Sequence, residues 1–260
     1  MEIEGILYWG YALSIYLVLS SSVVSAIELS AVPAHYFSFI YPKISSLIVQ
    51  KSRWVIVHTI QVLLAIASGV LFYFEYVSVF KVAFAGLSIL SLYCYVKRAI
   101  SKDGADQIRI LTLLSFSFCF VLNDHDGKLV SLIFMGCQGL LGYSTSAIAK
   151  LASPYWRKGN VLHLIFGTYA YGIPKLSNFL RNHPKLERLL AHGAIAMMLA
   201  VPLSFGIPSP YAIAIALVGI FSFHFATAVI MGLNDFLMTF PVVYPGIILL
   251  HGLLHNYITL

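Results

Sequence analysis

Charged residues are scarce in this chain. Only 10% of its 260 residues are Asp, Glu, Lys or Arg, whereas 60% are hydrophobic. Soluble domains carry about 25% charged residues, so the composition excludes an ordinary soluble domain. It predicts an all-α polytopic membrane protein, because a helix satisfies its own backbone hydrogen bonds in lipid. The length suits a single transmembrane domain over residues 1–260, with about seven spans of ~20 residues each.

The chain also lacks the common signatures of catalysis and of redox pairing. Its three cysteines (Cys94, Cys119 and Cys137) lie inside apolar segments and form no C-x-x-C, so we interpret them as buried apolar residues. There is no P-loop, dinucleotide-binding glycine motif, G-x-S-x-G or H-E-x-x-H. These absences argue against ATPases, ordinary dehydrogenases, serine hydrolases of that class and zincin proteases.

Long apolar runs predict the membrane-spanning helices. We place seven spans at residues 6–27, 54–74, 79–96, 110–122, 129–149, 189–205 and 211–231. The fourth is short, which is typical of a tilted or partial span or of a helix that begins earlier. The tail, 236–260, is apolar but is interrupted by Pro241 and Pro245. For this tail a shallow helix, a re-entrant helix and an eighth span all stay open.

Basic residues gather in alternate loops. The loops at 31–53, 97–109 and 151–190 hold most of the 16 Lys and Arg residues. The positive-inside rule therefore predicts a multi-pass protein of the cell membrane, with these loops cytoplasmic and the N-terminus outside. Because the net charge of +6 resides in such loops and no run resembles a nucleic-acid module, we expect membrane lipid and no nucleic acid as partner.

Lys150 ends the fifth predicted span and is followed by an aromatic and basic cluster that includes Trp156. A buried lysine can become a neutral amine and act as a base near neutral pH. A lysine at a helix end can also extend to the lipid head groups. We name Lys150 as a candidate catalytic residue, and extension of its side chain to the lipid head groups is the alternative.

Histidines within or beside the spans are further candidates. His224 lies in the middle of the seventh span and His192 at the start of the sixth. Ionisable groups at membrane depth usually face the interior of a bundle and often mark function, although a hydrogen-bonded core histidine is the alternative. His58 and Gln61 share one helical face by their spacing.

Two patterns suggest metal ligands but lack a complete set. The polar stretch 123–128, NDHDGK, lacks further metal ligands at the spacing of an EF-hand. Its Asn, Asp and Gly residues are typical of a solvated turn between two spans. His251 and His255 are four residues apart, without a third ligand nearby. We therefore predict no metal site.

The segment 143–159, YSTSAIAKLASPYWRKG, contains Lys-Leu, a short turn and then Trp-x-x-Gly. This pattern resembles the signature of the HTTM family, the transmembrane region shared with vitamin K-dependent gamma-carboxylase. Further weak matches follow in the family's order at 192–193, 223–225 and 231–236, and 123–127 matches its polar loop loosely. The resemblance covers residues 120–236.

The resemblance implies that Lys150 is the base that deprotonates reduced vitamin K, a quinone-type cofactor, with His224 and His192 as supporting groups. Trp156, His58 and Phe223 are our candidates for contact with that cofactor; His58 lies outside the matched region and is named because its helical face can line the same interior. The large peptide-binding soluble domain of the carboxylase has no counterpart in this chain, so gamma-carboxylation of glutamate is not expected.

Short bacterial relatives include the membrane subunit of a sporulation-delaying-type toxin maturation pair. The resemblance thus implies a membrane enzyme, or a subunit of one, that modifies a small peptide such as a bacteriocin together with a soluble partner. A non-enzymatic toxin immunity protein, receptor or assembly factor is the alternative. A transporter is a third and weaker hypothesis, because the sequence shows no inverted repeat.

Overall fold

A computed structural model describes residues 3–31, 51–98, 102–122, 124–168 and 172–258. These residues form helices and no strand, which confirms the all-α prediction. The helices are α1 (Ile3–Ala31), α3 (Lys51–Tyr73), α4 (Val77–Lys97), α5 (Gly104–Cys119), α6 (Asp124–Ala152), α7 (Pro154–Lys158), α8 (Leu162–Phe166), α9 (Pro174–Asn182), α10 (Pro184–Ser204), α11 (Pro210–Met231), α12 (Asn234–Thr239), the 3₁₀ turn η2 (Phe240–Val243) and α13 (Tyr244–Leu254).

Seven helical segments of the described residues are long and apolar enough to cross a membrane. The chain is therefore a multi-pass integral membrane protein. The number agrees with the prediction, but the set differs in one member. The C-terminal segment Asn234–Leu254 qualifies, whereas α5, at 16 residues, does not. For the tail, the sequence leaves a shallow helix, a re-entrant helix and a further span open. The structure shows a segment that is long enough to span the membrane.

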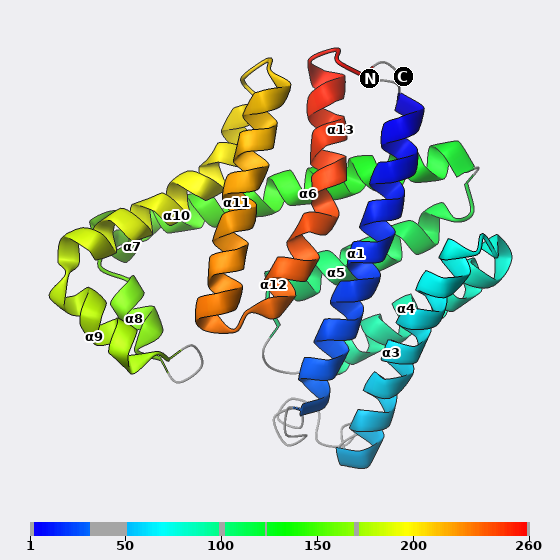
Figure 1. Ribbon diagram of the computed structural model, residues 1–260, viewed down its shortest axis with the longest axis horizontal. Coiled ribbons are helices and arrows are strands. Elements are labelled where there is room, and N and C mark those ends of the chain that lie inside the picture. Colours follow the sequence, from blue (N-terminus) through cyan, green and yellow to red (C-terminus); the bar gives the residue numbers. More distant parts are fainter. Residues whose placement is uncertain (1–2, 32–50, 99–101, 123, 169–171, 259–260) are drawn as a thin grey trace.

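α1 begins and α13 ends at the same end of the bundle (Figure 1). This arrangement requires an even number of crossings. The seven candidate spans together with α5 supply that number, since α5 runs between the end of α4 and the start of α6. With 16 residues α5 is about 24 Å long, slightly less than the hydrocarbon thickness of a bilayer. The short helices α8 and α9 lie beside the bundle, next to the start of α10 (Figure 1).

α6 crosses the bundle behind α1, α11 and α13 (Figure 1) and contributes Leu132 and Met135 to the core. It approaches α13 closely at Gly136, where a Cβ atom would overlap the backbone of Gly246. Small residues allow two helix backbones to pack this closely in a membrane. The apolar core then extends from this crossing through α1, α4, α5 and α11.

α5 begins six residues before the expected start of its span at residue 110. The cause is a capping box, in which the side chain of Asp103 accepts a hydrogen bond from the Asp106 amide and Asp106 accepts one from the Asp103 amide. The prediction of a basic loop over residues 97–109 is therefore wrong for its second half, and the alternative that the fourth helix begins earlier is confirmed. Asp106 and Arg109 belong to a helix and are buried.

Candidate functional site

A buried network of four charges lies where α4 ends and α5 begins. Asp106 accepts hydrogen bonds from both Arg98 and Arg109, and Arg109 also pairs with Asp235 of α12. Arg98, Asp106 and Arg109 are each at most 5% exposed. Two positive and two negative groups balance one another, which is the condition under which charges are tolerated away from water.

Hydroxyl groups complete this charge network. Ser21 of α1 donates to Asp235 (3.1 Å) and contacts Thr239, which itself donates to Asp235 (2.9 Å). The network thus joins α1, α5 and α12. Burial raises the pKa of the neighbouring Asp103 carboxyl and lowers the pKa of the Arg98 guanidinium. The space enclosed beside the network is only about 20 Å³, enough for about one water molecule.

His58 lies among polar partners next to this charge network. Its Nδ1 is 2.5 Å from Oε1 of Gln61, and Nε2 of Gln61 donates to Ser91 of α4 (3.1 Å). The face shared by His58 and Gln61 is as the sequence predicts, and both are buried. The imidazole also meets the ring of Trp54 edge-on, with 4.3 Å between centroids.

Lys150 forms a corner with α7. Its ammonium donates to Oγ of Ser146, one turn earlier (3.0 Å), and lies 5.0 Å from the ring centroid of Trp156. His192 of α10 is exposed and donates from Nε2 to the carbonyl of Arg157 (3.0 Å). Lys150 and His192 therefore both contact α7, from two different helices. A hydroxyl acceptor and an aromatic face are both contacts that suit a charged ammonium.

His224 is buried, at 2% exposed, between α6 and the C-terminal segment. Its ring stacks on Phe240 (4.3 Å between centroids), and Nε2 is 3.3 Å from the hydroxyl of Tyr143. Phe223 meets the same imidazole edge-on at 5.6 Å. Tyr143 precedes Lys150 by two helical turns, so this cluster lies about 10 Å along α6 from the Lys150 corner.

The six residues predicted for a site therefore occupy three places. Lys150, Trp156 and His192 surround α7, His224 and Phe223 form a second cluster, and His58 belongs to α3 beside Gln61. His251 and His255 hold the end of α10 and the turn that follows it, because they donate to the carbonyls of Ser204, Phe205 and Ile207. Of the polar stretch 123–128, Asn123 lies outside the described residues.

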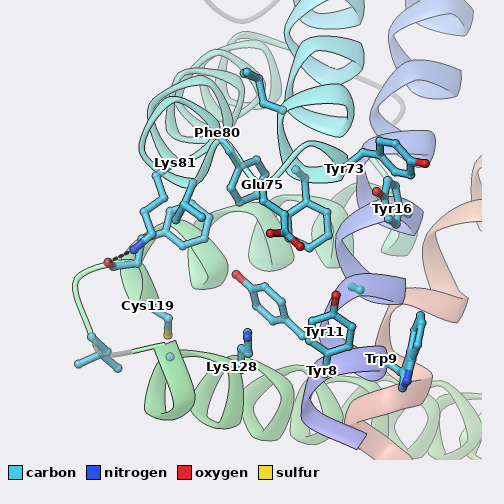
Figure 2. Close-up of a pocket in the computed structure, with 17 residues that line it drawn as sticks. Tyr8, Trp9, Tyr11, Tyr16, Tyr73, Glu75, Phe80, Lys81, Cys119 and Lys128 are labelled. Carbon is cyan, nitrogen blue, oxygen red and sulfur yellow. Dashed lines mark hydrogen bonds between the residues drawn. The ribbon is translucent and has the colours of Figure 1, made fainter. Parts of the chain in front are cut away.

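The large cavity lies elsewhere, at the end of the bundle opposite the charge network. It has a volume of about 730 Å³ and lies among α1, the α3–α4 turn, the end of α5 and the start of α6 (Figure 2). None of the six predicted residues lines it. We call it the aromatic cavity, because its walls carry Tyr8, Trp9, Tyr11, Tyr16, Phe72, Tyr73, Phe80 and Phe120.

Three charged side chains also face the aromatic cavity. In Figure 2, Glu75 lies at the α3–α4 turn above Tyr8 and Tyr11, and Lys128 lies below Glu75 on the α6 side. Lys81 lies at the edge, where its ammonium donates to the carbonyl of Phe120 (3.1 Å). Apolar walls with a few convergent polar groups, in a volume between about 300 and 1,000 Å³, are typical of small-molecule sites.

Sequence reasoning missed the aromatic cavity. Tyr8 and Trp9 have the position of interface aromatics, which is how a membrane protein ordinarily uses such residues. One signal in the sequence could have indicated the cavity. Aromatic residues and lysines cluster at five helix ends, and a topology diagram places these five ends on the same side of the membrane. Nothing local to any one of these ends indicates a cavity.

Comparisons with protein-family profiles, curated proteins and solved structures give no match. The resemblance to the HTTM family therefore stays a prediction.

Proposed function

We propose that this protein binds an amphipathic small molecule in the aromatic cavity, with an apolar body against the rings and a polar head near Lys81, Lys128 and Glu75. The observation that carries the proposal is the coincidence of volume, aromatic walls and three charged groups in one cavity. A bilayer offers such molecules at high local concentration. The function is thus one of reception or carriage of a lipid-like ligand.

A cavity-filling variant tests this function. Ala12 lines the cavity, so Ala12→Phe occupies part of its volume without altering any charge. Ala226→Phe, at an exposed position of α11, is the matched control. We expect a pyrene-labelled phospholipid to bind the wild type and Ala226→Phe and to lose most of its binding in Ala12→Phe. Equal binding by all three proteins, or none by the wild type, would overturn the proposal.

A second candidate function rests on the Lys150 corner. Following the HTTM resemblance, the protein is a membrane enzyme or enzyme subunit that matures a small peptide with a soluble partner, with Lys150 as base and a reduced quinone as cofactor. Supporting observations are the half-buried ammonium and its contact with Trp156, the one predicted cofactor residue beside Lys150. To act as a base, Lys150 has to give up a proton while Ser146 and Trp156 hold the amine in place.

Quinone extraction tests this second candidate. The purified wild type and an Arg157→Ala control should both carry quinone, and Lys150→Ala and Trp156→Ala should carry much less. A wild type without quinone, or Lys150→Ala with an undiminished amount, would count against the assignment.

We also propose that the basic loops face the cytoplasm and that the aromatic cavity opens toward the outer face, since it lies at the end where α1 begins. In intact cells an impermeant maleimide should label a cysteine placed at Asp126 and not one placed at Arg181, in a background without the native cysteines. The reverse labelling would invert the orientation.

A further inference from the structure

The aromatic cavity carries charged groups of both signs. Lys81 and Lys128 come from the starts of α4 and α6, whereas Glu75 comes from the α3–α4 turn (Figure 2). No ion pair or hydrogen bond of the Glu75 carboxylate occurs among the described residues. Lys81 directs one hydrogen bond to a carbonyl, and an ammonium has three donors. The cavity therefore offers a carboxylate that can bind a positive group and ammonium donors that can bind a negative group.

Glu75 has an unusual backbone conformation. Its φ of 59° lies in the left-handed region, where glycine and asparagine are common and other residues are strained. The three-residue turn between α3 and α4 does not itself require a carboxylate. Strained residues gather at ligand sites because the side chain they present is used. Here that side chain is the one acid among the described residues that line the cavity.

Aromatic rings lie around Glu75. Tyr16 packs edge-on against Phe72 at 5.5 Å, and Phe72 lies 6.5 Å from Tyr11. Figure 2 shows Tyr16 and Tyr73 together on one side of the carboxylate. Aromatic faces attract organic cations, and an acid among them strengthens that preference. The ammonium of Lys128, 6.0 Å from the ring centroid of Tyr11, and the ammonium of Lys81 at the cavity edge both suit an anion.

We propose that the ligand of the aromatic cavity is a phospholipid with a zwitterionic amino head group. Its ammonium group lies beside Glu75 and the neighbouring rings, its phosphate lies toward Lys81 and Lys128, and its acyl chains leave along the apolar walls. The inference rests on the proposed function, because it names the class of ligand for the same cavity. A purely anionic lipid would place negative charge beside an unpaired Glu75.

A competition assay tests the head group. Purified full-length protein in detergent binds a pyrene-labelled phosphatidylcholine, which is displaced by phosphatidylethanolamine, phosphatidylglycerol or diacylglycerol with the same acyl chains. We expect phosphatidylethanolamine to compete at about tenfold lower concentration than phosphatidylglycerol, as one charge-assisted contact implies. Glu75→Gln should remove this preference, and Lys128→Gln should weaken both phospholipids.

Two further measurements distinguish an error in the head-group inference from an error in the proposed function. Glu75→Gly relieves the left-handed strain, so it should unfold at an equal or higher temperature than the wild type while losing the preference for the amino head group. Free phosphoethanolamine should compete poorly, and competition as strong as that of the lipid would overturn the lipid assignment. Equal competition by both phospholipids, or a preference that survives Glu75→Gln, overturns the head-group inference alone. Lack of any probe binding by the wild type overturns the proposed function as well.

Discussion

The two ends of the bundle use charged side chains in opposite ways. At the end where α4 meets α5, Arg98, Asp106 and Arg109 are buried and paired, and the space beside them is about 20 Å³. At the other end, Glu75 and Lys81 line a cavity of about 730 Å³. A charge with its partner on the same chain stabilises the fold, whereas a charge beside an open cavity is available to a ligand. The difference predicts that substitutions at the two ends affect different measurements.

The largest effect is expected for Asp106→Asn. This change leaves both Arg98 and Arg109 buried with a weakened partner, and breaking a buried ion pair in this way costs about 3–5 kcal/mol. We expect failure to fold or a much lower unfolding temperature in detergent. Asp126→Asn, an exposed acid near the cavity end, is the control and should change stability by less than about 0.5 kcal/mol. Equal stability of the two variants would contradict a structural role for the charge network.

Asp235→Asn should have the next largest effect. Asp235 accepts from Arg109 and Ser21, which ties α12 to α5 and α1. Hydrogen bonds to charged groups contribute about 1.5–3 kcal/mol, so we expect a loss of this size in denaturant unfolding. Asn234→Ala, next to it in sequence, removes only an exposed contact with Glu28 and is the control. A larger loss in the control would show that α12 is held mainly by its exposed contacts.

Asp103→Ala tests the start of α5. The change removes the N-cap hydrogen bond to the Asp106 amide, and lost caps typically cost about 1 kcal/mol. Asp103→Asn keeps a capping side chain and should retain most of the stability. If both variants unfold alike, the charge of Asp103 and not its cap is what stabilises the helix.

The smallest effects on stability are expected at the aromatic cavity. Lys81→Gln and Glu75→Gln should each change the free energy of unfolding by less than about 0.5 kcal/mol, because neither side chain is buried in an ion pair among the described residues. Both should nevertheless weaken binding of the labelled phospholipid. A large loss of stability with intact binding would remove the distinction between the two ends.

Much of the fold follows from local sequence. Six of the seven predicted spans coincide with helices that are long and apolar enough to cross a membrane, because hydropathy over about 20 residues is a local property. The earlier start of α5 is one of the alternatives left open for the short fourth span, and the pair Asp103 and Asp106 has the spacing of a capping box. Next to Lys97, Arg98 and Lys102, these acids are equally typical of a solvated loop.

The candidate sites could be predicted only in part. The shared face of His58 and Gln61 and the burial of His224 follow from helical spacing and depth. The contact between Lys150 and Trp156 bridges two neighbouring helices and is within reach of sequence reasoning. The aromatic cavity is not, since its walls come from the ends of α1, α3, α4, α5 and α6.

By itself the sequence determined that this protein lies in a membrane as a helical bundle, because sparse charge and long apolar runs leave no other stable arrangement. Only the tertiary structure decided which charges are paired. Arg109 pairs with Asp235, 126 residues further along the chain, and Glu75 of the α3–α4 turn lines a cavity together with Lys128 of α6. Pairing depends on which helix ends meet in space, and the composition of each end does not specify its neighbours.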